Sequence, residues 1–160
     1  MAASDKFEHY LLELIFNNEG SPTLEIGDSS GLRGSSTAGS LYVALHTAAP
    51  DSPGENPTNQ SVSECDYTGY ARQAVARSTS GWTVTDSSGT TTVKNAAEIS
   101  FQQCTGGSNT ATFFSIGTRG EDTSPADSEV LFFGELTASL AISSGITPRF
   151  AADALSISLD

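Results

Sequence analysis

The chain has 160 residues, of which 37% are hydrophobic and 16% are charged, a composition that suits one folded domain. Its 19 acidic and 7 basic residues give a formal net charge of -12, and the basic residues are scattered along the chain. Because nucleic-acid affinity requires clustered Lys and Arg, and anionic membranes repel negative charge, this balance excludes both kinds of partner.

Neither the N-terminus nor any other stretch resembles a membrane or export segment. No run of about 18 apolar residues could span a bilayer, and the cationic and apolar regions of a signal peptide are absent. We therefore expect synthesis and residence in a cytoplasm. In that reducing compartment Cys65 and Cys104 are expected to be buried or half-buried free thiols, with a disulfide between neighbouring strands as the alternative.

Apolar residues at helical spacing predict one amphipathic α-helix over about residues 5–16, within an N-terminal arm of residues 1–20. Its stripe consists of Phe7, Tyr10, Leu11, Leu14 and Ile15. The helix either covers an open end of a sheet or docks on a neighbouring subunit. For the second role the candidate contacts are Phe7, Leu11 and Leu14.

Residues 21–40 are rich in Gly, Ser and Thr, which predicts a loop that follows the surface. Its apolar anchors are further candidate interface residues, namely Leu24, Ile26 and Leu32. Residues 27–31 also match the G-x-S-x-G pattern of serine hydrolases. That mechanism needs a helix after the serine and a histidine base within reach, but no helical pattern follows and His46 lies in a predicted strand.

An all-β domain is predicted over residues 41–160, as an antiparallel β-sandwich or a jelly-roll-like barrel. In its first strand, 41–47, apolar residues alternate with others, and this pattern places His46 on the solvent-facing side. The other strands are predicted at 69–77, 81–85, 91–93, 98–102, 110–116, 129–133, 136–142, 150–152 and 154–159. The core-facing residues of the last strand are expected to be Leu155, Ile157 and Leu159.

The sequence carries no clear motif of a catalytic, metal or nucleotide site, so we expect a protein that is not an enzyme and has no cofactor. Its two histidines, His9 and His46, belong to no zinc-binding cluster. Four aromatic residues could form a carbohydrate-binding platform, although core or interface packing is the simpler interpretation. They are Tyr42, Tyr67, Tyr70 and Trp82.

Several segments together resemble small virion structural proteins of tailed bacteriophages, a family often labelled tail fibre or structural protein. The segments are LYVALHTAAP at 41–50, GYAR at 69–72, NAA at 95–97, FSIGT at 114–118 and GITPRF at 145–150. The likeness is one of strands and turns and spans most of the chain. It implies a non-enzymatic virion component, assembled in the host cytoplasm.

Two physical arguments bear on its place in the virion. A fibre shaft usually consists of sequence repeats, which this chain lacks, whereas a compact acidic β domain can bind the outer capsid surface as a decoration (cement) protein. We therefore expect a homo-oligomer, possibly a trimer, that binds the major capsid protein or other virion subunits. The alternatives are a tail, neck or tail-fibre component and a carbohydrate-binding host-recognition module.

Overall fold

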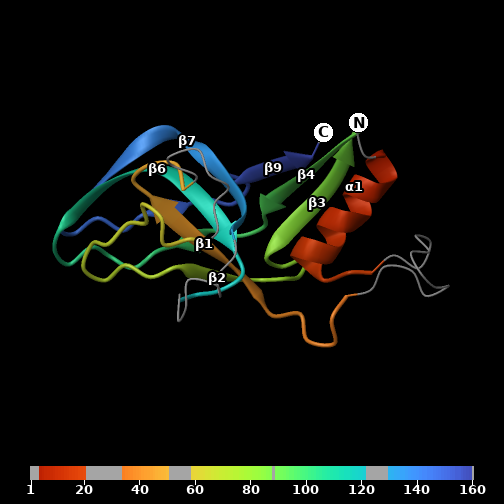
Figure 1. Cartoon of the computed structure of the whole chain (residues 1–160), viewed down its shortest axis with the longest axis horizontal. Coiled ribbons are helices and arrows are strands. Elements are labelled where there is room, and N and C mark those ends of the chain that lie inside the picture. Colours follow the sequence, from red (N-terminus) through yellow and green to blue (C-terminus); the bar gives the residue numbers. More distant parts are fainter. Residues whose placement is uncertain (1–3, 21–33, 51–58, 88, 122–129, 160) are drawn as a thin grey trace. The chain divides into compact units, whose positions relative to one another are not determined.

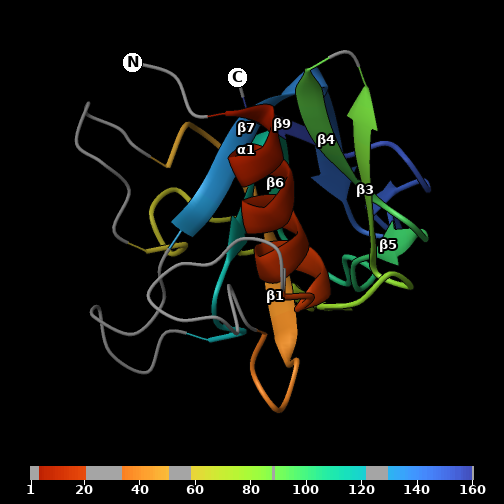
Figure 2. The same ribbon diagram turned by 90° about the vertical axis from the view of Figure 1, so that its right-hand side faces the viewer.

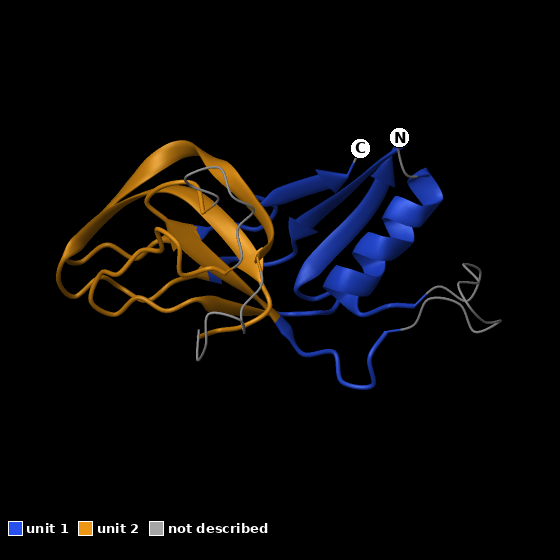
Figure 3. Cartoon of the chain, in the orientation of Figure 1, with its two compact units in different colours: residues 1–40, 76–99, 150–160 blue, residues 41–75, 100–149 orange. Residues whose placement is uncertain are grey.

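The computed structural model describes residues 4–20, 34–50, 59–87, 89–121 and 130–159. It confirms the predicted fold class, since antiparallel strands dominate and a short helix lies near the N-terminus (Figure 1). The chain forms two compact units (Figure 3). The first contains residues 1–40, 76–99 and 150–160, and the second contains residues 41–75 and 100–149. Strands of the predicted β domain are thus distributed over both units.

The first unit packs a helix against a three-stranded antiparallel sheet (Figure 2). The sheet has the order β3-β4-β9, formed by β3 (Trp82–Ser87), β4 (Thr90–Asn95) and β9 (Ser156–Leu159). Helix α1 (Asp5–Leu12) contacts β3 and β4. The main core residues of this unit are Leu12, Phe16, Trp82, Val93, Leu155 and Ile157. The predicted alternation of the last strand is confirmed, because Ser156 and Ser158 are exposed while Leu155 and Ile157 are buried and Leu159 is half-buried.

The helix buries a different stripe from the one predicted. Ser4 caps its start, and the Ser4 hydroxyl accepts a hydrogen bond from the main-chain N–H of Phe7 at 3.4 Å. After Leu12 the chain continues as a π-helical turn, η1 (Glu13–Asn17). The stripe against the sheet is Glu8, Leu12 and Phe16, which follow each other at i, i+4 and i+8. This arrangement leaves Phe7 36% exposed.

The end of the helix is held by Arg77, a residue that lies between β2 (Gln73–Ala76) and β3. Its guanidinium donates hydrogen bonds to the carbonyl oxygens of Leu14 and Ile15, both at 2.6 Å, and to that of Ala38 at 3.0 Å. The last carbonyls of a helix have no partner within the helix, so a cation at this position satisfies them. Arg77 therefore fixes both the end of η1 and the chain that leads into β1 (Ser40–His46).

Asn18 and Ser35 close the segment that lies between them. Asn18 adopts the left-handed conformation, with φ of 58°, and its amide nitrogen donates to the carbonyl oxygen of Ser35 at 2.8 Å. Its amide oxygen accepts from the N–H and the hydroxyl of Ser35, both at 2.8 Å. Next to this clasp, a Cβ atom on Gly34 would overlap the main-chain carbonyl oxygen of Asn18.

Gly34→Ala is therefore expected to break the clasp and to lower the free energy of unfolding by about 1–3 kcal/mol. Denaturant unfolding of the full chain measures the loss. Ser36→Ala is the matched control, since Ser36 is exposed, and it should change the free energy by less than about 0.5 kcal/mol. Equal effects of the two substitutions would contradict the proposed role of the clasp.

The second unit is built on a four-stranded sheet of order β2-β1-β6-β7. Its strands are β1 (Ser40–His46), β2 (Gln73–Ala76), β6 (Ser108–Gly117) and β7 (Val130–Ser143). On one face of the sheet, Val43 lies opposite Ile116 and Leu45 opposite Phe114, and all four side chains are buried. The short strands β5 (Ile99–Ser100) and β8 (Arg149–Phe150) pair with each other.

Candidate functional site

The other face of the same sheet carries a buried polar network around His46, so the predicted exposure of this residue is wrong. Gln60 and Val62 form hydrogen bonds with groups on that face, and Glu64 pairs with His46 in a β-bridge at the edge of β1. Both faces of β1 are therefore buried. In such a strand the alternation of residues in the sequence does not indicate which side chains face solvent. Three members of the network, His46, Gln60 and Ser115, are each 0% exposed.

The hydrogen bonds of this network define one tautomer of His46. Nδ1 lies 2.9 Å from the Val62 carbonyl oxygen, which can only accept, so Nδ1 carries the proton. Nε2 then accepts from the Ser115 hydroxyl at 2.7 Å. The Gln60 amide donates to Ser115 Oγ at 2.9 Å and to the Tyr42 carbonyl oxygen at 2.9 Å. The network thus ties residues 60–62 to strands β1 and β6.

A serine hydroxyl 2.7 Å from a histidine is also the geometry of a nucleophile and its base. Catalysis requires that a substrate reach the serine oxygen, and Ser115 and His46 are both fully buried. The pair is therefore a packing element of the sheet. The G-x-S-x-G pattern at 27–31 lies outside the described residues.

Burial lowers the pKa of His46 below its ordinary value, partly offset by the Val62 carbonyl and Glu64, while Arg72 lowers it further. Below about pH 6.5 His46 is protonated in the unfolded chain, whereas in the folded chain it stays neutral to a lower pH. The free energy of unfolding should therefore fall as the pH falls. The slope for one proton is at most about 1.4 kcal/mol per pH unit. Denaturant unfolding of wild type and His46→Gln from pH 7.5 downward tests this. The difference between the two slopes of unfolding free energy against pH gives the contribution of His46, and equal slopes would contradict the prediction.

A second buried cluster lies in the same unit and contains an ion pair. Arg72 donates from Nε and Nη2 to the two carboxylate oxygens of Glu64, each at 2.8 Å, and their side chains are only 4% and 15% exposed. The Tyr70 hydroxyl donates to Glu64 Oε1 at 2.9 Å and accepts from the Leu45 N–H at 3.0 Å. Burial is the main cause that raises the pKa of Tyr70. Arg72 also donates to the Arg119 carbonyl oxygen at 3.2 Å.

A cavity of about 300 Å³ adjoins this cluster. Its lining residues are Glu64, Tyr70, Ala71, Arg72, Gly120 and Glu121. The charges of Glu64 and Arg72 offset each other, and the Tyr70 ring packs against Tyr67 and Phe101 at 5.3 and 6.1 Å between centroids. Three polar side chains of the cavity wall, those of Glu64, Tyr70 and Arg72, are thus engaged in contacts that hold the fold. No group of three or more His, Cys, Asp or Glu in the described part of the chain is placed to hold a metal ion.

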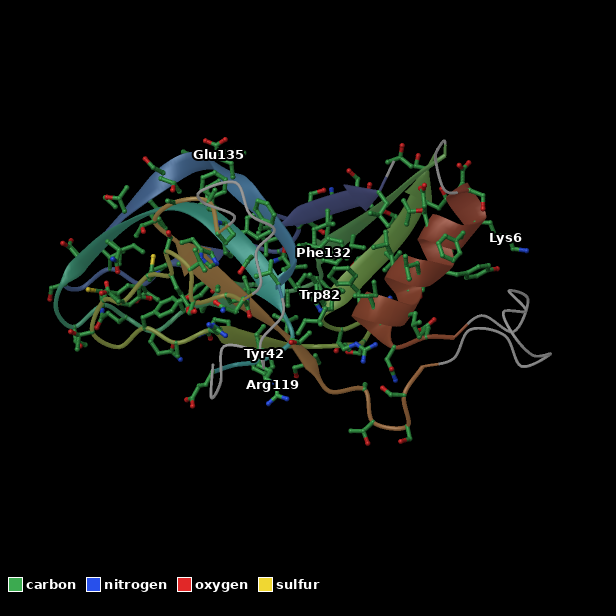
Figure 4. The ribbon with its side chains drawn as sticks, viewed as in Figure 1. Lys6, Tyr42, Trp82, Arg119, Phe132 and Glu135 are labelled. Atoms are coloured by element: carbon green, nitrogen blue, oxygen red, sulfur yellow. The ribbon has the colours of Figure 1, made fainter. Side chains whose placement is uncertain are left out.

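The carbohydrate-platform hypothesis is wrong for Trp82, which is 0% exposed. Trp82, labelled in Figure 4, comes from β3 of the first unit. Its ring meets Phe16 edge to face in the core of that unit, with 4.9 Å between centroids. Tyr67 is buried in the second unit, where its hydroxyl donates to the Gln102 carbonyl oxygen at 3.0 Å. The simpler interpretation, core packing, is confirmed for both residues.

The two cysteines lie buried in the second unit as free thiols. Burial raises the pKa of Cys65 to about 12, and the neighbouring carboxylates of Glu64 and Asp66 add to this rise. The Cys104 thiol donates to the carbonyl oxygen of Gly106 at 3.3 Å. A thiol that stays protonated at neutral pH is a poor nucleophile, so Cys65 acts as a core residue.

The predicted interface residues fall into two groups. Phe7 is exposed on α1, while Leu11 and Leu14 are half-buried. The other three, Leu24, Ile26 and Leu32, lie outside the described residues. The structure therefore leaves part of the predicted apolar stripe accessible on the helix, and its role as an interface stays a prediction.

Strand β7 is the feature that the sequence analysis missed. The analysis expected strands at 129–133 and 136–142, but the structure has one strand of 14 residues. The gap that the prediction left between them, at 134–135, lies inside this strand, where a Cβ on Gly134 would approach the Phe114 ring to 3.0 Å. The pairing with β6 runs regularly from Phe132 to Glu135 and is irregular on both sides of that stretch. On this strand Leu131 and Phe133 are 37% and 39% exposed.

The described part of the chain is thus an antiparallel β protein whose buried polar groups hold strands and loops together, as in a structural protein. Comparison with protein families identifies it further, since the family described as podophage GP4 fiber I protein gp80 matches residues 31–158. The chain belongs to this family of phage virion proteins, which confirms the resemblance seen in the sequence.

Curated protein sequences give no match to this chain. Across the described residues, none of the helices has the length and apolar character needed to cross a membrane.

Proposed function

We propose that this chain is a non-enzymatic structural subunit of a bacteriophage fibre. The observation that carries the proposal is the match to the podophage fibre I family, which covers residues 31–158 and hence most of both compact units. A fibre is a virion appendage built from protein subunits, so the chemistry required of this chain is stable folding and contact with neighbours.

The side-chain geometry supports a structural role. The serine and histidine with catalytic spacing are fully buried, and the best-defined ion pair, between Glu64 and Arg72, fixes a loop against the sheet. Exposed apolar side chains occur on a helix and a sheet edge, at Phe7, Leu131 and Phe133. Such residues suit contacts between proteins.

Capsid decoration is the second candidate, with the major capsid protein as partner. It is favoured by the net charge of -12, which a compact protein on the outside of the head would direct toward solvent. A fibre subunit accommodates the same charge, and the family match favours the fibre.

Electron microscopy of purified virions labelled with gold-conjugated antibody to this chain tests the proposal. We expect gold along the fibres and none over the head, with virions lacking the gene as the control. Gold distributed over the head shell would support decoration and refute the fibre role. A particle without any label would refute both.

A further inference from the structure

The buried pair of Ser115 and His46 has a carbonyl group beside it, the side-chain amide of Gln60. The amide nitrogen lies 2.9 Å from Ser115 Oγ, and all three residues are 0% exposed. Because the amide carbon is one bond of about 1.33 Å from that nitrogen, it lies at most about 4.2 Å from Ser115 Oγ. The interior of the second unit thus holds a hydroxyl, a base and an electrophilic carbon next to one another.

The fold holds this amide by its nitrogen. Nε2 of Gln60 donates to the Tyr42 carbonyl oxygen at 2.9 Å, and since that oxygen can only accept, the contact distinguishes the nitrogen of the amide from its oxygen. Oε1 is buried and receives no hydrogen bond from the described residues. A buried carbonyl without a donor is unfavourable, and an ester carbonyl, which is a weaker acceptor than an amide carbonyl, lowers that cost.

His46 has the tautomer that a base requires. Its Nδ1 proton is held by the Val62 carbonyl oxygen at 2.9 Å, so the lone pair of Nε2 faces the Ser115 hydroxyl at 2.7 Å. Burial lowers the pKa of His46, which keeps the ring neutral and able to accept a proton at neutral pH. The Val62 carbonyl orients the ring, in the same way as the acceptor at the far nitrogen of a catalytic histidine.

We propose that Ser115 and Gln60 form an intramolecular ester with release of ammonia, which links residue 60 covalently to β6. Ser115 Oγ donates a lone pair to Gln60 Cδ, while its proton passes to His46 Nε2 and the carbonyl π electrons move to Oε1. The pair on Oε1 then re-forms the carbonyl as the Cδ–Nε2 bond breaks, and the leaving nitrogen takes the proton from His46 Nε2. Ammonia leaves and His46 is neutral again, so the step needs no co-reactant.

Burial excludes an outside substrate but favours this internal reaction. The folded site holds the nucleophile and the electrophile together, which replaces an encounter between two molecules. Water, which would hydrolyse the ester, has no access to three fully buried side chains. The step occurs once in each chain, so a slow rate is sufficient and the protein is not an enzyme. The product keeps the segment at Gln60 attached to the sheet when the hydrogen bonds around it break.

Mass spectrometry of the purified full chain tests the proposal. The wild-type chain should be lighter than its sequence requires by about 17 Da, the mass of one ammonia molecule. Digestion after Lys and Arg leaves Gln60 and Ser115 on different peptides, 34–72 and 95–119, which the ester should hold together as one species. Fragmentation of that species should locate the link at these two residues.

Substitutions assign the reacting groups. Ser115→Ala removes the nucleophile and Gln60→Glu removes the leaving group, so each variant should keep its full mass and give two separate peptides. Ser108→Ala is the matched control, because Ser108 is exposed on the same strand, and it should lose ammonia as the wild type does. His46→Gln removes the base and should slow ester formation at least about a hundredfold, measured as the linked fraction at intervals after synthesis.

A wild-type chain with the full mass of its sequence would overturn the inference, whether or not the variants fold. A loss of ammonia that persists in Ser115→Ala would overturn it too, because the ammonia would then come from another amide. Either result leaves the proposed fibre role intact, since the ester does not depend on that role and gold labelling tests the role separately.

Discussion

Arg72→Met is expected to lower the free energy of unfolding by about 3–5 kcal/mol, because it leaves the largely buried Glu64 carboxylate without its cation. Glu64 would keep the hydrogen bond from the Tyr70 hydroxyl, but lose both N–H donors of the guanidinium. The segment around Glu64 also pairs with His46, so the loss should extend to the covered face of the sheet. Denaturant unfolding monitored by circular dichroism gives the difference from wild type.

Two further variants distinguish loss of the pair from loss of one side chain. Arg72→Met combined with Glu64→Gln removes both charges, and should cost clearly less than the sum of the single changes, because no unpaired charge is left buried. Arg119→Met is the surface control, since the Arg119 side chain is exposed, and should change stability by less than about 0.5 kcal/mol. If Arg72→Met were as mild as Arg119→Met, Glu64 would have to be hydrated in the folded protein.

The periodicity of the sequence predicted the type of most elements correctly. Strand β1 begins one residue before its predicted start, and β9 shows the predicted alternation of Ile157 with serines. The prediction failed where tertiary contacts decide. The prediction placed a break at 134–135, but in the structure β7 runs through it, and Gly134 fits closely against the ring of Phe114. Likewise, the chain turns from α-helical to π-helical geometry at Glu13, within the range predicted as one α-helix.

The polar clusters could not be predicted because their members are distant in sequence. Ser115 lies 69 residues from His46, and no local motif indicates that β6 would place them 2.7 Å apart. The one available signal was the composition of the predicted strand at 41–47. None of its seven residues carries a formal charge when His46 is neutral, so either face of the strand could be buried. Glu64 and Arg72 are closer in sequence, but a separation of eight residues does not specify a contact between loops.

Trp82→Ala is expected to destabilise the first unit by about 3–5 kcal/mol. Trp82 is the largest fully buried side chain and meets Phe16 edge to face, so its removal leaves a cavity between β3 and the end of the helix. Because the indole Nε1 is buried without a hydrogen-bond partner, Trp82→Phe removes an unsatisfied donor and keeps most of the aromatic contact. That variant should cost less than about 1.5 kcal/mol.

Far-UV circular dichroism during denaturant unfolding measures both variants, since the chain has a single Trp and its fluorescence is lost with either change. Similar stabilities of Trp82→Ala and Trp82→Phe would contradict the packing role. The same result bears on host recognition. A loss of glycan binding in Trp82→Ala would reflect the disrupted core, so a recognition function has to be tested at an accessible residue such as Glu121, which lines the cavity of the second unit.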